Sequence, residues 1–331
     1  MSNPSQKLIV VKDYLNRFPQ LPSLTISKKI YNENKLLYKD VEEVRSRVRY
    51  ARGSYGNKHR KQLKDKTHLG KTPVPVLPES HQEKRTPLQL PLANNNILLL
   101  SDFHVPYHDN DAINCALEYG KKEKINTILL NGDVMDFYML SRFMKDPRQR
   151  SVKQEFDAAR ALLVYIRHVF PKADIYWLMG NHDMRYEHWL MTKAPEIFDD
   201  SYYKLEERLR LNELKIKVVD ELTMVKAGKL FIAHGHKWSN GQFSPVNAAR
   251  GLWTRLKRSA IMGHTHSVSQ HTEKDVAQEL TSCWSTGCLC ELQPAYNPWT
   301  NKFVHGFAHI QVHKDKNYTV KNYTIIDGQI L

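Results

Sequence analysis

The sequence predicts two different parts: a small, basic, all-α module of helix-turn-helix type, and a larger α/β domain built on a buried sheet. Three observations support this division. Positive charge is concentrated near the N-terminus, a proline-rich stretch follows it, and apolar runs then alternate with amphipathic stretches. A chain of 331 residues has room for two domains. We expect the basic module at residues 1–65, a linker at 66–95 and the α/β domain at 96–331.

The charge distribution indicates a polyanionic partner. Residues 1–66 hold 16 Lys and Arg but six Asp and Glu, a net charge of +10 out of +14 for the whole chain. Such an excess favours contact with nucleic acid or an anionic surface. No apolar run approaches 18 residues, so we expect no membrane insertion. The N-terminus lacks the apolar core of a signal peptide, which favours a cytoplasmic protein.

Three helices are expected in the basic module, at residues 6–18, 23–34 and 40–53. The third begins with the pattern of a capping box, in which Asp40 is followed three residues later by Glu43. Its apolar positions fall on one stripe, and a second stripe consists of Arg45, Arg49 and Arg52. A helix that is buried on one side and carries arginines on the other is typical of a nucleic-acid contact. The alternative is a solvated basic face on a small helical cap.

The linker and the α/β domain follow from composition and periodicity. Residues 66–95 contain five prolines and no regular period, which predicts a semi-rigid, extended connection. The next part contains apolar runs typical of buried strands, at residues 96–100, 125–131, 173–179, 214–219, 229–233 and 259–262. Amphipathic stretches at 111–123 and 151–170 lie between the first three runs. This alternation predicts a buried sheet covered by helices.

Metal-ligand residue types follow five of these runs. They occur in the motifs Asp102-Phe103-His104, Gly132-Asp133-Val134-Met135-Asp136, Gly180-Asn181-His182-Asp183, His234-Gly235-His236 and Gly263-His264-Thr265-His266. In open α/β sheets, functional side chains gather beyond the carboxyl ends of the strands. Oxygen and imidazole ligands together suit divalent ions such as Mn²⁺, Fe²⁺, Zn²⁺ or Ni²⁺. Five such motifs in order therefore indicate a metal site.

These motifs resemble those of the calcineurin-like metallophosphoesterase superfamily over roughly residues 96–312. The shared pattern is D-x-H, G-D-x-x-D, G-N-H-D, a histidine before glycine, and G-H-x-H. The resemblance implies a four-layer sandwich of two β-sheets flanked by helices, and a phosphoesterase that uses two divalent metal ions. "GNHDMRYEHW", "GCLC" and "YNPWTNKFVHGF" are similar to stretches of phage and bacterial members, so a viral protein would act in the host cytoplasm.

The resemblance also implies a role for each residue. The first metal would be bound by Asp102, His104 and His266, the second by Asn181, His234 and His264, and Asp133 would bridge the two. His182 would assist the leaving oxygen, and Asp183 would hold the proton on His182. Mn²⁺ is the metal we expect first, with Fe²⁺, Zn²⁺ or Ni²⁺ as alternatives. The nearby Asp136, His108 and His236 are candidates for the acceptors that orient the metal-binding imidazoles.

The substrate is narrowed by one departure from the family pattern. Protein phosphatases usually carry G-D-x-V-D-R-G, whose arginine grips the phosphate, whereas this chain reads "GDVMDFYML", with Phe137 at that position. This difference argues against an enzyme that acts on phosphoserine, and Arg185 is a candidate phosphate contact instead.

The chemistry of two metal ions suits a phosphodiester substrate. Two metals about 3.5–4 Å apart can neutralise a phosphodiester and hold an acidified bridging water, as hydroxide, in line for attack.

The leading hypothesis is therefore a two-metal phosphodiesterase or nuclease, delivered to nucleic acid or a nucleotide derivative by the basic module. One alternative is a phosphatase of small-molecule or phosphoprotein monoesters. A second, of another class, is a DNA-binding protein with a non-catalytic phosphoesterase scaffold. The cysteines, Cys115, Cys283, Cys288 and Cys290, are expected to be reduced thiols; the alternative is a small zinc site built from the last three, although a paired C-x-x-C is missing.

Overall fold

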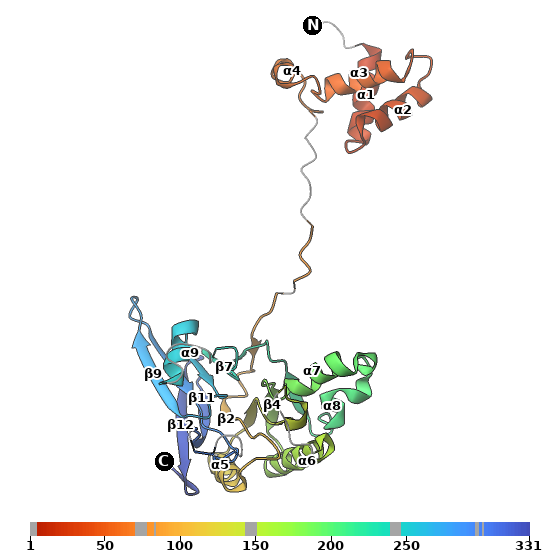
Figure 1. Cartoon of the computed structure of the whole chain (residues 1–331). Coiled ribbons are helices and arrows are strands. Elements are labelled where there is room, and N and C mark those ends of the chain that lie inside the picture. The colour runs from red at the N-terminus through yellow and green to blue at the C-terminus, as the bar shows by residue number, and fades with distance from the viewer. Residues whose placement is uncertain are drawn as a thin grey trace. The chain divides into compact units, whose positions relative to one another are not determined.

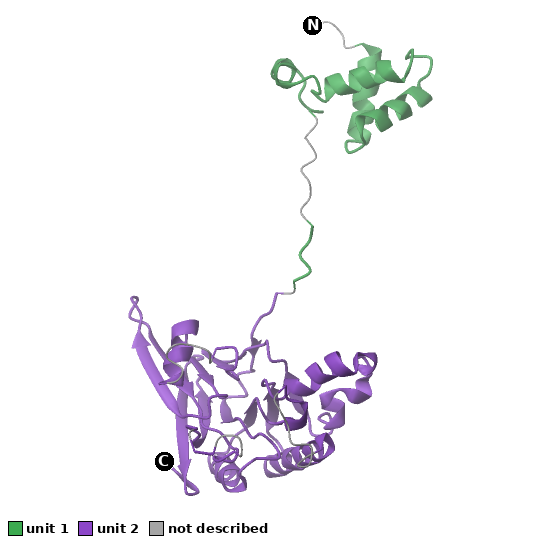
Figure 2. Ribbon diagram, in the orientation of Figure 1, with its two compact units in different colours: residues 1–82 green, residues 83–331 purple. Residues whose placement is uncertain are grey.

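The computed structural model describes residues 5–69, 78–82, 84–142, 151–238, 246–294, 298–299 and 301–331. The chain forms two compact units, Met1–Gln82 and Glu83–Leu331 (Figure 2). Residues 70–77 and 83 of the expected linker lie outside the described part. Among the described helices, none has the length and apolar character needed to cross a membrane.

In the described residues of the first unit, the regular elements are all helices. It contains α1 (Gln6–Arg17), α2 (Ser23–Glu33), α3 (Val41–Ala51) and α4 (Asn57–Gln62) (Figure 1). The expected apolar stripe of α3 packs into a small core with the other helices; its buried residues are Val11, Tyr14, Leu15, Ile26, Ile30, Tyr38, Val44, Val48 and Ala51. Asp40 caps α3 by accepting a hydrogen bond from the Glu43 N–H at 2.8 Å. The Glu43 carboxylate in turn accepts from the Lys39 N–H at 2.9 Å, so the return bond reaches one residue further back than in a standard capping box.

The second unit contains two sheets. The larger has the order β13-β12-β11-β2-β3-β4-β5 and the smaller the order β1-β6-β7-β8-β10-β9. The strands of the larger sheet are β2 (Asn96–Leu100), β3 (Thr127–Asn131), β4 (Asp174–Leu178), β5 (Ile216–Val219), β11 (His305–Val312), β12 (Tyr318–Ile326) and β13 (Gln329–Ile330). Those of the smaller are β1 (Leu88–Gln89), β6 (Val225–Ala227), β7 (Leu230–Ala233), β8 (Ala260–Met262), β9 (Ser269–Lys274) and β10 (Leu280–Ser285).

The two sheets and their helices form four layers. Along β2, Ile97 and Leu99 point into the core between the sheets, where they meet residues such as Ile232 of β7. Leu98 and Leu100 point to the opposite face, which is covered by α5 (Asn110–Lys122) and α6 (Val152–Val169). The outer face of the smaller sheet is covered by α9 (Ala248–Leu256). Burial on both faces explains why β2, β3 and β4 are continuous apolar runs. The predicted four-layer α/β architecture is confirmed.

One shorter element follows β3 and the others follow β4. They are η1 (Tyr138–Leu140), α7 (Met184–Lys193), η2 (Pro195–Ile197), η3 (Ser201–Tyr203) and α8 (Leu205–Arg208).

The expected linker is too long at its C-terminal end. Residues Leu88 and Gln89 form β1, which pairs in parallel with Val225 and Lys226 of β6. Leu90 is buried beside this pair in the core between the sheets. A strand of two residues is shorter than any periodicity can detect, and the nearby prolines conceal it. The α/β unit therefore begins before residue 96.

Candidate active site

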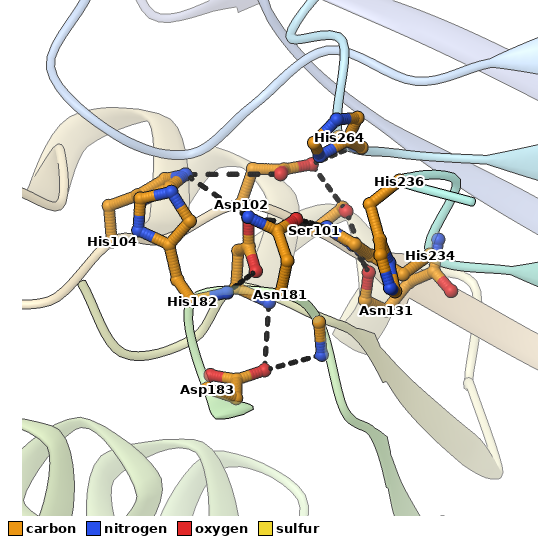
Figure 3. A network of polar contacts seen from close by, with 12 residues as sticks. Ser101, Asp102, His104, Asn131, Asn181, His182, Asp183, His234, His236 and His264 are labelled. Atoms are coloured by element: carbon orange, nitrogen blue, oxygen red, sulfur yellow. Dashed lines mark hydrogen bonds and ion pairs between the residues drawn. The ribbon is translucent and has the colours of Figure 1, made fainter. Parts of the chain in front are cut away.

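The strand order brings the five motifs together. Strands β2, β3 and β4 are parallel neighbours, so the residues after them share one edge of the larger sheet. In the smaller sheet β7 and β8 are also parallel and deliver the two remaining motifs. Figure 3 shows the resulting cluster, in which the side chains of both sheets point toward one another. The contacts of the structure bring together all seven expected metal ligands: Asp102, His104, Asp133, Asn181, His234, His264 and His266.

One half of the cluster contains Asp102, His104 and His266. The Nε2 atoms of the two histidines lie 3.1 Å apart. Asp102 Oδ1 is 3.3 Å from His266 Nε2 and 3.9 Å from His104 Nε2. The other carboxylate oxygen of Asp102 is held by the His264 N–H at 2.9 Å and by the Ser101 hydroxyl at 2.6 Å. These bonds fix Asp102 with Oδ1 facing the two imidazoles.

Asp133 lies between this group and the second one. Its Oδ2 atom is 3.8 Å from His104 Nε2 and 3.2 Å from His234 Nε2, while Oδ1 accepts a hydrogen bond from the His182 N–H at 2.8 Å. Asn181 Oδ1 is 3.2 Å from His234 Nε2. The His264 ring lies 5.1 Å from that of His234, and their ligand atoms can meet that of Asp133 around one ion.

Imidazoles in the cluster are oriented through their Nδ1 atoms. His234 Nδ1 donates to the Asn131 carbonyl at 2.8 Å, and His104 Nδ1 donates to Asp136 Oδ1 at 3.0 Å. Nδ1 is thereby engaged in both rings and Nε2 is directed at the Asp133 carboxylate, where it could bind a metal once its proton is released. Asp136 is thus confirmed as an orienting acceptor. His236 instead contacts Glu221 at 2.9 Å, and His108 forms an isolated β-bridge with Cys290.

The backbone of the cluster adopts a conformation that side chains usually avoid. Five of the seven residues have positive φ: Asp102 (59°), His104 (48°), Asp133 (51°), His264 (64°) and His266 (53°). Only a few per cent of non-glycine residues do so, and such residues concentrate at functional sites. Gly180 allows the close approach of two of these turns, because a Cβ there would collide with the Asp133 side chain and backbone.

The donor set fits a pair of divalent cations. Asp102 Oδ1 is buried and, among the described residues, lacks a well-formed hydrogen bond, although His266 Nε2 lies 3.3 Å away as an ion-pair partner. An orphaned buried carboxylate oxygen is costly unless a cation satisfies it. Carboxylate, amide and imidazole donors within a few ångströms of one another match a borderline divalent metal.

Comparison with known proteins identifies the family of this chain. The calcineurin-like phosphoesterase family matches residues 96–296. The chain belongs to this family. Solved structures similar to this phosphoesterase include a Vps29 mutant from Entamoeba histolytica (18% identity, 71% of this chain and 96% of that one, TM-score 0.37). Others are the phosphoesterase YfcE of E. coli (14%, 71% and 96%, TM-score 0.36) and a dimetal phosphatase from Danio rerio (12%, 69% and 96%, TM-score 0.37). No curated protein matches the chain.

Electrostatics keep the carboxylates of this phosphoesterase ionised. Burial opposes ionisation of Asp102, yet the His266 and His234 imidazoles hold the pKa of its carboxyl at about 2. Burial likewise opposes ionisation of Asp133, but His234 and His182 keep its pKa well below the usual range. Burial and the neighbouring His234 lower the pKa of His264 to about 3, so its imidazole is neutral. Burial opposes protonation of His234 and His266, but Asp133 raises the pKa of His234 to about 9 and Asp102 raises that of His266. The ionised carboxylates and the neutral His264 therefore suit a cation directly, and binding through His234 and His266 would release their protons.

His182 lies at the edge of the cluster. Its Nδ1 is 3.1 Å from both the carboxylate and the carbonyl oxygen of Asp136, so Asp136 orients His104 and His182 together. Its Nε2 accepts a hydrogen bond from the Arg185 guanidinium at 2.9 Å, and Arg185 also donates to the Asp136 carbonyl at 2.8 Å. Arg185 therefore sits directly at the nitrogen expected to act on substrate.

The expected role of Asp183 is wrong. Its carboxylate does not hold the proton on His182; it accepts from the backbone N–H groups of Asp133, Met135 and Gly180 at 2.8–2.9 Å. The Trp177 indole N–H donates to it at 3.1 Å. Asp183 thus connects the turn after β3 to the turn after β4. The carboxylate that contacts His182 Nδ1 is that of Asp136.

The sequence interpretation missed two neighbours of the metal ligands. Ser101, the residue before Asp102, donates to its carboxylate. Cys290 lies with its Sγ 3.9 Å from His266 Nδ1, and His104, His266 and Cys290 could together surround an ion. All four cysteines are free, as expected. The signal for Cys290 was the motif "GCLC", which we had considered only as part of a separate zinc site.

The three arginines expected to contact nucleic acid are not equivalent. Arg45 forms an ion pair with Glu42 at 3.1 Å on the surface of α3. Arg49 is exposed, and its guanidinium lies 5.5 Å from the ring centre of Tyr55. Arg52 donates to the Ser23 hydroxyl at 3.1 Å and to the Pro19 carbonyl at 3.2 Å, so it holds α3 against the turn between α1 and α2.

Proposed function

We propose that this phosphoesterase hydrolyses phosphodiester bonds of nucleic acid or of a nucleotide derivative, using two divalent cations, Mn²⁺ first among them. The observation that carries the proposal is the position of Asp133, whose inward oxygen faces His104 on one side and His234 on the other. One carboxylate between two ligand groups is the arrangement that a dinuclear site requires.

The bound cations would neutralise the phosphate and acidify a water for in-line attack. The protein's own residues would do the rest. Asp102, His104 and His266 would hold one ion, and Asn181, His234 and His264 the other, with Asp133 shared. His182 would supply a proton or positive charge to the leaving oxygen from Nε2, while Asp136 keeps its Nδ1 proton in place.

Arg185 gives this step a second cationic group. The Arg185 guanidinium is hydrogen-bonded to His182 Nε2. A substrate oxygen that enters between these two groups would therefore contact both the imidazole and the guanidinium. A planar guanidinium is suited to phosphate oxygens, so we assign Arg185 to the substrate phosphate.

The nucleic-acid part of the proposal is supported by the surface of the first unit. The exposed Arg49 is accompanied by two tyrosines, Tyr50 and Tyr55, that are 49% and 47% exposed. The His59 ring packs between them, 4.6 Å and 5.6 Å from the tyrosine ring centres. Exposed aromatic rings beside cationic groups are typical of surfaces that bind nucleic acid. We propose Arg45 and Arg49 as phosphate contacts, because the Arg45 ion pair with Glu42 lies at the surface. Arg52 would be a weaker contact, because its donors bond to Ser23 and to the Pro19 carbonyl.

The activity is tested with metal-reconstituted full-length protein on bis-p-nitrophenyl phosphate, p-nitrophenyl phosphate, single-stranded DNA and duplex DNA. We expect the diester and at least one nucleic acid to be cleaved in preference to the monoester. Preference for the monoester, with no cleavage of nucleic acid, would favour the phosphatase alternative. Metal-loaded protein that hydrolyses none of them would favour a non-catalytic scaffold.

The delivery role is tested by truncation and by salt dependence. A chain beginning at Lys84, which keeps β1, should retain diester hydrolysis but lose most of its affinity for nucleic acid. For the full-length protein, the double variant Arg45→Ala/Arg49→Ala should lower the slope of log affinity against log salt by up to about 2, and binding should weaken for all sequences. Arg210→Ala, an exposed arginine of the second unit, is the matched control. An unchanged slope would refute the assignment of these arginines.

A further inference from the structure

Three imidazoles of the metal cluster, those of His104, His234 and His266, have a partner at Nδ1, and the partner of His266 is unlike the other two. His104 and His234 use oxygen atoms, those of Asp136 and of the Asn131 carbonyl. His266 Nδ1 faces instead the Cys290 sulfur at 3.9 Å, within hydrogen-bond range for sulfur, on the side of the ring away from Asp102.

Two cysteine sulfurs lie near His266, and the one within hydrogen-bond distance of Nδ1 is that of Cys290, although Cys288 also interacts with this imidazole. The neighbouring Cys288 thiol is directed at the carbonyl oxygens of Val304 at 3.6 Å and Cys290 at 4.0 Å. Both cysteines are buried, with at most 3% of either exposed, so water does not compete for the imidazole proton. His266 is also fixed from its other face by the Phe303 ring, whose centre lies 4.2 Å away.

The loop that carries Cys290 is tied to the metal cluster through its backbone. Leu289 N–H donates to the Asp102 carbonyl at 3.1 Å, and the His305 imidazole donates to the Cys290 carbonyl at 2.9 Å. Val304 N–H donates to the His266 carbonyl at 2.8 Å. The sulfur and the imidazole are therefore held in place relative to each other by elements that also hold the metal ligand Asp102.

We propose that Cys290 is a positioning residue of the first metal site: its sulfur accepts the Nδ1 proton of His266 and thereby presents Nε2 to the metal. This inference rests on the proposed dinuclear function. It assigns a role to the second cysteine of "GCLC". Loss of a partner that orients a metal-binding histidine typically costs about 10- to 100-fold in metal affinity.

The experiment measures metal affinity rather than hydrolysis, so that it remains informative if the protein proves inactive on every substrate. Cys290→Ala, Cys290→Ser and the control Cys283→Ala are titrated with Co²⁺ and followed by visible absorption. Cys283 is an equally buried cysteine, but its thiol bonds to the Arg258 carbonyl outside the cluster. We expect Cys290→Ala to bind one of the two ions about 10- to 100-fold more weakly, with the other unchanged. Cys290→Ser should recover most of that affinity, since its hydroxyl also accepts, and Cys283→Ala should bind as wild type.

Three results would overturn the proposal. Wild-type affinity of Cys290→Ala for both ions would show that the sulfur does not position His266. Equal losses in the alanine and serine variants, or in Cys283→Ala, would show that lost volume and not the lost acceptor is responsible. A sulfur-to-cobalt charge-transfer band in the wild type that disappears in Cys290→Ser would make Cys290 a direct ligand. A wild type that does not bind two ions would refute the proposed dinuclear function itself. That result differs from the three above, in which the wild type binds both ions and only the variants are compared.

Discussion

Replacement of Asp183 by alanine should damage the fold far more than the chemistry. The carboxylate is buried, with 1% exposure, and accepts from four donors on two separate turns. Alanine would leave all four without an acceptor. Each buried unsatisfied donor costs about 1–3 kcal/mol, so the loss should be at least about 4 kcal/mol. For a unit of this size, a loss of about 1 kcal/mol in the free energy of unfolding lowers Tm by about 2–4 °C. A loss of about 4 kcal/mol therefore predicts a fall in Tm of about 8–16 °C.

The assay is thermal unfolding of the wild type, Asp183→Ala, Asp183→Asn and the control Asp199→Ala, each with chelator and with Mn²⁺. Asp199 is an exposed carboxylate close in sequence, and its removal should leave Tm unchanged. Asparagine keeps one acceptor oxygen but turns an NH₂ group toward the donors, so it should fall between wild type and alanine. If Asp183→Ala melts like the wild type and loses only kcat, then Asp183 acts on His182 after all and the structural reasoning is refuted.

Asp133→Asn should weaken the binding of both ions and abolish hydrolysis, because the shared carboxylate loses its charge; elemental analysis that finds two ions in the variant would contradict this. His182→Ala should keep both ions yet lower kcat by roughly 10²–10⁴, the usual contribution of a positioned acid; a variant that loses metal would instead make His182 a ligand. Glu43 should stabilise the first unit against acid, because its hydrogen bond from Lys7 holds its pKa at about 2. That stabilisation is present above about pH 4.5 and lost as the pH falls toward 2, so Glu43→Gln should flatten the acid unfolding curve, followed by circular dichroism, in this window.

The position of the site was predictable because each motif follows a recognisable strand. An apolar run ends, and Asp, Asn or His appears at once, as in Leu100 to Asp102 and Met179 to Asn181. Parallel strands then bring these ends together without further information. The helices were predictable for a similar reason, since their apolar stripes and caps are local.

What the side chains do at the site was less predictable. Asp183 and Asp136 are both acids beside a metal ligand, and spacing does not reveal which one faces His182. The answer depends on contacts between turns some fifty residues apart, such as Asp183 with the Asp133 N–H. The short strand β1 and the sulfur beside His266 were missed for the same reason, because each is defined by a partner that is distant in sequence.

The left-handed backbone at five of the metal-facing residues bears on how this protein can be evolved in the laboratory. Holding a residue such as His264, at φ 64°, in that conformation costs about 1–2 kcal/mol, which glycine does not incur. Selection for heat resistance alone, without metal or substrate, should therefore enrich glycine at these positions. The selected variants should be more stable to heat but inactive. Libraries of this enzyme should be screened for turnover and thermal resistance together, with the divalent ion present throughout.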